Sequence, residues 1–502
     1  MGQSIATDAY RSTAAVESIE DQVQRALDWL RPRLLDLARA IQGGQLTPAV
    51  FLQLELKLVV LLRDFGRLLL ELLLNGREGE GSLLPHDVID EGQGYRRLGK
   101  KTRNAHVATL FGTICLWRFG YRFWEPLVKE SCIFPLELQL GLIEGATPAL
   151  ADYIGRRMAE AGATQSRVLQ QLREEHGVSI GVKRLRKLVS MISEGLSEHR
   201  QAAQVEELLR VLHLADSSRG NRKPVVAVGR DGITLREYQY RFFEVATTAT
   251  VTVFDRAGKR LTTIFLAWCP ELGQSTISQM LTDLLTDVFA KWHGPLPTLA
   301  YVADSGGNES SYFEDTLRWM RHPRTGERLK WQRVVDFYHA AERVWAMAAA
   351  LFGQGTARYF VWARRRLRIL KRKPRGAKRV LHSGATLAAR RKMGKSRLKE
   401  FRKAYNYIRK RTKWMRYSEY RKCHIPLGSG ITEAACKTLF TQRLKLSGMR
   451  WKKTGAQQIL TLRAILLSNT WTATYAMTLA TREASLPRPY AVGHSQNERK
   501  AA

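Results

Sequence analysis

The sequence predicts an α/β protein, in which a mixed β-sheet is covered by helices, interrupted by an all-helical insertion and preceded by a mainly helical N-terminal region. Apolar, β-branched runs of strand length occur first in succession and then alternating with helical stretches. These runs are Val225–Val228, Phe242–Phe254, Leu261–Trp268, Pro297–Ala303 and Trp331–Val335. From Gly353 to Lys422 the β-type pattern stops, and the chain becomes helical and strongly basic.

Residues 1–92 are expected to form helices rich in leucine and arginine. Within them Val50–Leu74 is the most apolar stretch of the chain, but charged residues, among them Lys57, Arg63, Asp64, Arg67 and Glu71, interrupt it and make insertion into a bilayer costly. We interpret it as a buried or self-associating amphipathic helix, and therefore as a candidate dimerisation element. Residues Met1–Glu20 lack an apolar signal core, so export is not expected.

Residues 93–216 are predicted to hold a β-hairpin followed by helices. His106–Leu110 and Thr113–Trp117 flank a Phe-Gly break, which favours the hairpin. Ser166–His176, a glycine and then Ile180–Val189 fit a helix-turn-helix whose basic second helix enters a DNA groove. Short basic helix pairs are also common without that role, so both interpretations stay open. The residues assigned here to the DNA backbone are Lys183, Arg184 and Arg186.

A polar linker, Ser217–Pro224, leads into the sheet domain. The remaining segments are the first part of that domain (224–352), a basic helical insertion (353–424), a helix carrying Glu433 followed by C-terminal helices (425–485), and a polar tail expected to be disordered (486–502). Acids are sparse in the insertion, so its cations are expected to follow backbone phosphates. They are Arg364, Arg365, Arg366, Arg368, Lys371, Arg372 and Lys373.

The charge of the whole chain points to a polyanionic partner. Lys and Arg number 81 against 46 Asp and Glu, a formal net charge of +35 over 502 residues. Such a field attracts polyanions and raises their encounter rates, and neutralising phosphates releases counterions. Nucleic acid is the expected partner. The five cysteines are isolated and odd in number, which favours a reducing, cytoplasmic compartment and gives no disulfide framework or Cys-x-x-Cys zinc site.

Three acids, far apart in sequence, are the candidate catalytic residues. Asp231 follows the first apolar run, Asp304 ends the fourth, and Glu433 lies in the first turn of a helix that Gly430 opens. Singly, each also fits a structural role: an Asp-Gly turn, a helix N-cap, or a carboxylate favoured by a helix dipole or paired with Lys437. Together they are expected to converge, because functional groups gather beyond the carboxyl ends of strands in open sheets.

Three convergent carboxylates repel one another unless a cation joins them. Hard oxygen ligands suit Mg²⁺ or Mn²⁺, which also accept substrate phosphate oxygens. Two such ions about 4 Å apart activate the attacking oxygen and stabilise the leaving one at phosphorus. The sequence therefore predicts a two-ion phosphoryl-transfer site, which needs no Ser-His or Cys-His nucleophile.

At these residues the sequence resembles bacterial insertion-sequence transposases of the Asp-Asp-Glu superfamily, most of all the Kra-type family. The resemblance covers about Pro224 to Leu467, near half of the chain. The matching stretches are Val228–Gly232, Tyr301–Asn308, Val335–Ala340, Ile425–Lys437, Arg443–Lys445 and Ser447–Trp451. The resemblance implies a ribonuclease-H-like sheet with Asp231, Asp304 and Glu433 as the metal-binding acids. It also implies that the substrates are double-stranded DNA, namely transposon ends and target DNA. The protein would then act at the bacterial nucleoid, as a homodimer or higher oligomer on DNA.

The resemblance also implies supporting or DNA-contacting residues. Asp336 and His339 match an Asp-x-x-His element shared with Mutator-like and hAT-type enzymes, and Arg450 and Trp451 match an Arg-Trp element after the Glu433 helix, where Lys437 also lies. On its chemistry alone, Trp451 fits base stacking or a core position equally. Asp336 also follows a strand and is the rival of Asp304, which we prefer because its Ser-Gly-Gly neighbours leave room for metal and phosphate. Some relatives carry further cysteines in the region after the hairpin. Here only Cys115 and Cys132 are nearby, so the zinc module of those relatives is not expected in this chain.

Two alternatives stay open beside a transposase. A nuclease on the same sheet would hydrolyse DNA without joining strands, and a domesticated DNA-binding protein would have lost catalysis. Three intact acids disfavour the second. A glycosidase with two carboxylates is disfavoured by the charge and by the scarcity of aromatic clusters near the acids.

Overall fold

The computed structural model describes residues 18–77, 85–124, 132–236, 243–304 and 306–490. The protein is mixed α/β, as predicted, and contains two β-sheets. The described residues group into two compact units, one from those within 18–158, 164–192 and 476–490, the other from those within 159–163 and 193–475. The division falls inside a long helix, α6 (Val182–Asp216), upstream of the polar linker.

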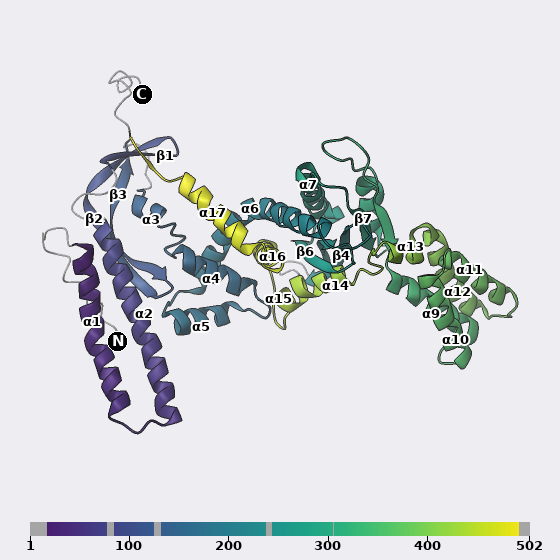
Figure 1. Cartoon of the computed structure of the whole chain (residues 1–502), viewed down its shortest axis with the longest axis horizontal. Coiled ribbons are helices and arrows are strands. Elements are labelled where there is room, and N and C mark those ends of the chain that lie inside the picture. Colours follow the sequence, from purple (N-terminus) through teal and green to yellow (C-terminus); the bar gives the residue numbers. More distant parts are fainter. Residues whose placement is uncertain (1–17, 78–84, 125–131, 237–242, 305, 491–502) are drawn as a thin grey trace, which may run out of the picture. The chain divides into compact units, whose positions relative to one another are not determined.

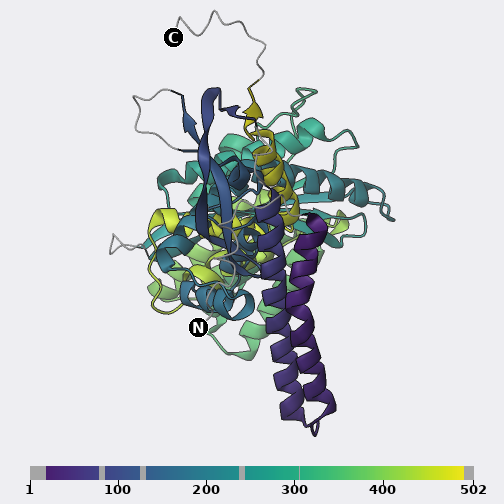
Figure 2. The same cartoon turned by 90° about the vertical axis from the view of Figure 1, so that its left-hand side faces the viewer.

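The first unit begins with a helical hairpin, α1 (Ile19–Gln42) and α2 (Pro48–Arg77), whose loop end extends away from the rest of the unit (Figures 1 and 2). Its sheet has the strand order β3-β2-β1-β9. Its remaining elements are β1 (Asp87–Asp90), β2 (Gln93–Thr109), β3 (Gly112–Phe123), α3 (Pro135–Gln139), α4 (Pro148–Ala159), α5 (Gln165–His176), the start of α6, the end of α17 (Trp471–Ala484) and β9 (Arg488–Pro489).

The predicted hairpin around Phe111 is confirmed, but it is longer than expected. β2 starts at Gln93, and β1 pairs with it across a turn in which Glu91 (φ 49°) and Gly92 (φ 81°) are left-handed. β1 and the start of β2 carry polar residues on both faces, so a search for alternating hydrophobicity does not find them. The tail 486–502 was expected to be disordered, but its residues Arg488 and Pro489 form β9 and pair with β1, so the prediction is wrong for them. Residues 491–502 of the tail lie outside the described part of the chain.

Polar side chains of α2 cap the outer edge of this sheet. Asn75 accepts from the backbone N–H of Trp117 at 2.7 Å and donates to the carbonyl of Cys115 at 2.8 Å, and Glu71 accepts from the Cys115 N–H at 3.1 Å. Burial raises the pKa of Glu71 despite this hydrogen bond. Because the helix occupies the edge groups of β3, another chain cannot pair there.

The second unit is built on a five-stranded sheet with the order β6-β5-β4-β7-β8, in which β4 is antiparallel to β5 and parallel to β7. The predicted succession of three antiparallel strands, then helix, strand, helix and strand, is confirmed. The elements are β4 (Val225–Arg236), β5 (Phe243–Phe254), β6 (Arg260–Trp268), α7 (Ser275–Lys291), β7 (Thr298–Ala303), α8 (Gly307–Ser311), the π-helix η3 (Tyr312–Leu317), β8 (Gln332–Val335) and α9 (Phe337–Phe352).

Helices cover both faces of this sheet because its strands alternate between two cores. Val226 and Val228 pack toward α6 and α7, whereas Val225 and Ala227 pack toward α9 and the helices that follow it. Those helices form the predicted helical segment between β8 and the Glu433 helix (Figure 1). They are α10 (Ala357–Arg372), α11 (Gly376–Ala389), α12 (Lys395–Arg411), the short η4 (Thr412–Trp414) and α13 (Tyr417–Lys422).

The chain then returns to the sheet through α14 (Gly430–Cys436), the π-helix η5 (Lys437–Thr441), α15 (Gln442–Leu444) and α16 (Lys453–Leu467). Helix α14 packs directly on β4, since a Cβ atom at Gly229 would lie 2.0 Å from Thr432 Oγ1. The Thr432 hydroxyl is also hydrogen-bonded to that of Thr250 on β5, at 2.8 Å. Only glycine at 229 allows the helix to approach this closely, and this approach places Glu433 over the sheet.

Candidate active site

The strand registers align three aspartates in one row of the sheet. The last β4–β7 pair is Val228 with Tyr301, and continuing that register by three residues aligns Asp231 with Asp304. The last β7–β8 pair is Ala303 with Val335, so the next position aligns Asp304 with Asp336. Residues in one row of a parallel sheet face the same side. The three aspartates therefore lie beside one another, on the side of β4 that α14 covers.

Asp231 lies inside β4, and the expectation that it follows the strand is wrong. The strand continues beyond its apolar run because β5 pairs with it along its full length, with Asp231 opposite Thr248. The carboxylate accepts the backbone N–H of Gly232 at 2.8 Å. Burial, and then the charges of Glu433 and Asp304, raise the pKa of Asp231, although hydrogen bonds from Cys436 and Gly232 act against this. These charge effects place the predicted trio within electrostatic reach of one another.

The other two acids of the trio flank the His339 imidazole. Its Nε2 lies 3.9 Å from Asp304 Oδ2 and 3.9 Å from Glu433 Oε1. Partial burial alone would lower the pKa of His339, but a hydrogen bond to Glu342 and the charges of Asp336, Asp304 and Glu342 raise it. The side chains of Asp304 and Glu433 are 50% and 52% exposed, so both can meet a ligand that approaches from solvent.

Asp336 differs from the trio because the protein itself satisfies its carboxylate. The residue is 0% exposed and caps α9, with Oδ1 accepting the N–H groups of Tyr338 at 2.5 Å and His339 at 2.9 Å. Its Oδ2 accepts both the N–H and the hydroxyl of Ser429, the latter at 2.8 Å. The same hydroxyl oxygen lies 2.6 Å from Glu433 Oε1. Asp336 therefore joins the start of α9 to the start of α14.

A fourth acid, Glu309, was missed by the sequence analysis. Burial raises its pKa, and the charges of Asp304 and Asp231 raise it further. Its carboxylate fills the space beside Gly306, where a Cβ atom would lie 2.1 Å from Glu309 Oε2. The available signal was its position in Ser-Gly-Gly-Asn-Glu directly after Asp304, where small residues keep the chain close to the end of β7.

Cys436 is also close to the acids, and it is unsuited to nucleophilic chemistry. Burial raises the pKa of its thiol well above the usual range, and so do the charge of Asp231 and the hydrogen bond to it. The thiolate, not the thiol, attacks or binds soft metals. The groups around Asp231 are therefore hard oxygen donors with a neutral thiol beside them.

Among the described residues, no group of three or more Asp, Glu, His or Cys side chains lies close enough together to hold a metal ion. The charges of Asp304 and Glu433 nevertheless raise the pKa of Asp231, and those of Asp304 and Asp231 raise the pKa of Glu309, which is the electrostatic situation that a divalent cation relieves. The donor set fits Mg²⁺ or Mn²⁺ by its chemistry, with Asp231, Asp304 and Glu433 as the residues that would hold them. To share an ion, the half-exposed Asp304 and Glu433 must turn toward Asp231.

The cations predicted to follow DNA on α10 divide into two groups. Arg364, Arg365, Arg368, Arg372 and Lys373 are exposed. Arg366 is half-buried, with its guanidinium 5.9 Å from the Trp362 ring centre, and Lys371 Nζ lies 5.1 Å from that of Phe337, next to Asp336. The exposed group is available to a polyanion, whereas Arg366 and Lys371 also contribute to packing.

The predicted helix-turn-helix consists of α5, a left-handed Gly177 (φ 65°) and the start of α6. Lys183 is exposed, and Arg186 donates to Gln165 Oε1 at 3.0 Å. The Arg184 guanidinium donates to the carbonyls of Glu144 and His106 at 2.7 and 2.9 Å. Arg184 thus holds the helix against the preceding loop and hairpin, which leaves Lys183 as the better phosphate contact.

Beyond α14, Lys437 and Arg450 are exposed, whereas Trp451 is half-buried. The Trp451 indole N–H donates to the carbonyl of Leu444 at 3.0 Å, and the Arg443 guanidinium lies 5.1 Å from its ring centre. These contacts favour the structural alternative for Trp451. A more exposed aromatic ring lies beside the acids, since Tyr338 is 67% exposed and its ring packs over Gly428.

The chain matches no protein-family model and no curated protein. None of its described helices is both long and apolar enough to cross a membrane.

Proposed function

We propose that this chain is a DNA transposase that cleaves transposon ends and transfers the freed strands to target DNA. The observation that carries the proposal is that Asp231 lies in β4 and Asp304 directly follows its parallel neighbour β7, with both Asp304 and Glu433 of α14 within electrostatic reach of Asp231. Acids in this arrangement are what two-ion phosphoryl transfer requires, and the surrounding charge of +35 suits a DNA substrate.

The strand order supports the finer assignment of the fold. An antiparallel β4-β5-β6 meander followed by β7 and β8, both parallel in direction to β4, is the arrangement expected of a ribonuclease-H-like sheet. The helical insertion between β8 and α14 agrees with the transposase resemblance. The acids lie on the central strand, on its parallel neighbour and on the helix that covers them.

In the proposed mechanism, Asp231, Asp304 and Glu433 would hold the divalent ions that the reaction needs. When bound, the ions activate the attacking oxygen and stabilise the leaving one. Asp336 and Ser429 orient Glu433 by fixing the start of α14 against α9. His339 lies between Asp304 and Glu433, with Nε2 3.9 Å from each carboxylate, so that its imidazole separates the two acids. The exposed cations of α10 bind the backbone on either side of the cut.

Asp304 is preferred to Asp336 as the second acid because of their surroundings. All the hydrogen bonds of Asp336 run to protein donors, and the residue is fully buried, so a phosphate cannot reach it. Asp304 is half exposed. Asp336 is therefore a positioning residue.

The experiment is cleavage and strand transfer in vitro. A plasmid carrying the gene with its flanking DNA serves as donor, a second plasmid as target, and Mg²⁺ as the added ion. We expect Asp231→Asn, Asp304→Asn and Glu433→Gln each to lower cleavage by at least about 100-fold, and Glu419→Gln, an exposed acid on α13, to leave it unchanged. Cleavage without joining would identify a nuclease, and Mg²⁺-independent DNA binding without cleavage would identify a protein that has lost catalysis.

A further inference from the structure

The α1–α2 hairpin carries most of the exposed apolar surface of the described chain. Of the 27 large apolar residues exposed in the described ranges, 15 lie between Ile19 and Leu62. They include Phe51 at 52% and Val59 at 61% exposure. From Gln45 to Leu62 only Glu55 and Lys57 are charged. An apolar surface of this extent on a folded chain marks an interaction site.

The distal part of this hairpin has almost no core of its own. Helices of 24 and 30 residues bury Ala26, Leu30 and Leu54 as their apolar contacts there. The C-terminal part of α2 is held differently, because Glu71 and Asn75 bind the edge of β3. Two long helices with so little buried between them correspond to half of a four-helix bundle, which needs a second pair to complete its core.

The charge of the hairpin argues against DNA as its partner. Between residues 18 and 77 there are eight Lys and Arg against seven Asp and Glu, in a chain that carries 81 against 46. A near-neutral, apolar element offers a polyanion little to bind. It is also the part of the chain on which two strongly cationic copies can approach with the least repulsion.

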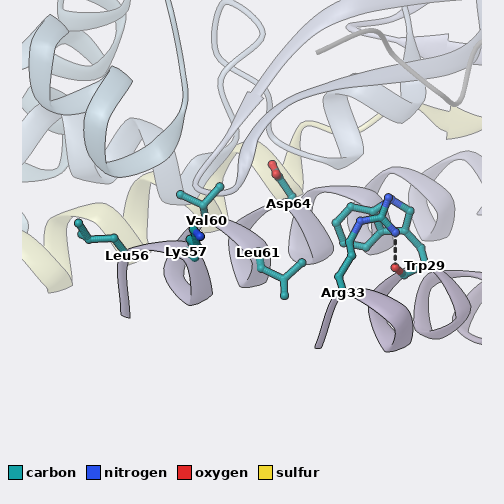
Figure 3. Close-up of a pocket in the computed structure, with 7 residues that line it drawn as sticks. All are labelled: Trp29, Arg33, Leu56, Lys57, Val60, Leu61 and Asp64. Carbon is teal, nitrogen blue, oxygen red and sulfur yellow. Dashed lines mark hydrogen bonds between the residues drawn. The ribbon is translucent and has the colours of Figure 1, made fainter. Parts of the chain in front are cut away.

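A groove runs between the two helices in this region (Figure 3). Trp29 and Arg33 of α1 form one wall, and α2 forms the other through Leu56, Val60 and Leu61 together with the charged Lys57 and Asp64. The Arg33 guanidinium lies 4.1 Å from the Trp29 ring centre and donates to the Trp29 carbonyl, so the wall is held in place. An apolar side chain from a facing helix fits such a groove as a knob fits a hole.

We infer that this hairpin pairs with the hairpin of a second copy to form a four-helix bundle. Fifteen large apolar residues, each about half exposed, offer roughly 1,000 Å² or more of apolar surface, against the roughly 800 Å² per partner that a stable interface buries. The pairing is symmetric, so each residue enters the interface twice. The dimer supplies the two active sites that paired cutting needs, and in that respect the inference rests on the proposed function.

The test is the mass of the full chain by sedimentation equilibrium, without DNA or added metal. The wild type is expected at twice the chain mass of 57.1 kDa. Phe51→Glu and Val59→Glu each place two unpaired charges in the bundle and should raise the dimer dissociation constant by roughly 100-fold or more. Leu272→Glu, at a fully exposed apolar residue outside the hairpin, is the matched control and should remain dimeric.

Far-UV circular dichroism identifies any variant that misfolds, and Val59→Ser, a milder change, then replaces it and should weaken the dimer in the same direction. A wild-type chain that sediments at 57.1 kDa across the micromolar range, or folded Glu variants that keep the wild-type mass, would overturn the inference. Because no DNA or metal is present, either result leaves the proposed chemistry to be judged by the cleavage assay alone.

Discussion

Asp336 accepts both the backbone N–H and the hydroxyl of Ser429, 93 residues further along the chain. The contact is buried and holds the start of α14 against the start of α9. Asp336 also accepts the N–H of His339, and Ser429 also contacts Glu433, so the same contact fixes the relative positions of His339 and Glu433. The Ser429 hydroxyl has one proton, so it can donate to only one of the Asp336 and Glu433 carboxylates at a time. The position of the third catalytic acid therefore depends on an aspartate outside the trio.

Asp336→Asn is expected to destabilise the protein and to lower cleavage. The new amide replaces one acceptor oxygen with a donor that faces other donors, and a buried unsatisfied group costs about 1–3 kcal/mol. Urea unfolding of the full chain measures the loss. Asp315→Asn, at an exposed acid of η3, is the control and should change stability little. Equal stability of the two variants would show that the buried contact with Ser429 contributes nothing.

Asp231→Asn is expected to increase stability at neutral pH. The pKa of Asp231 is raised mainly by burial, so the folded chain binds this proton more tightly than the unfolded chain. Folding stability must then fall as the pH rises through that raised pKa, and the substitution removes this loss. The gain should disappear as the pH falls below the ordinary aspartate pKa. Thermal unfolding of both proteins from about pH 3 to about pH 8, a range that spans the ordinary aspartate pKa, tests it, and a gain that is constant with pH would contradict the assignment.

The exposed cations of α10 are expected to set the salt dependence of DNA binding. Replacing Arg364, Arg365 and Arg368 with alanine should lower the slope of log K against log salt by roughly one per residue. Arg366→Ala is the comparison, because Arg366 is half-buried against Trp362 and its loss should act on stability more than on the slope. Fluorescence anisotropy of a labelled duplex at several salt concentrations gives the slopes. An unchanged slope in the triple variant would refute the role of α10.

Tyr338 and Trp451 are expected to respond oppositely to truncation. Tyr338 is exposed beside the acids, so Tyr338→Ala should weaken binding of DNA with unpaired bases at the cut by about 1–3 kcal/mol and leave stability unchanged. Trp451→Ala removes a half-buried ring and its hydrogen bond to Leu444, and should cost roughly 2 kcal/mol of stability. Binding of a gapped duplex and urea unfolding separate the two, and the reverse pattern would return base stacking to Trp451.

The sequence predicted the sheet of the second unit well because its strands are buried on both faces. Runs such as Val225–Val228 and Thr298–Ala303 are apolar throughout, which is typical of strands covered by helices on two sides. In the first unit, β1 and the start of β2 were missed because they carry many partly exposed polar residues. The helical insertion was predictable from the loss of the β-type pattern alone.

The sequence identified most residues of the candidate site, but it did not predict how they are arranged in space. That Asp231, Asp304 and Asp336 share a row follows from strand register, which depends on pairings between segments more than 30 residues apart. The burial of Asp336 and its contact with Ser429 require the insertion to fold back onto the sheet. Glu309 and Tyr338 are close in sequence to predicted residues, but their proximity to the acids depends on where helices α8 and α9 begin, which no local pattern specifies.

The central claim is that Asp231, Asp304 and Glu433 together hold divalent ions, and titration of Mn²⁺ into the full chain by calorimetry tests it most directly. With duplex DNA present, the wild type is predicted to bind about two ions per chain. Asp231→Asn, Asp304→Asn and Glu433→Gln should each weaken that binding at least about tenfold, whereas Glu419→Gln should not. Mn²⁺ binding that is unchanged in all three variants would contradict the account.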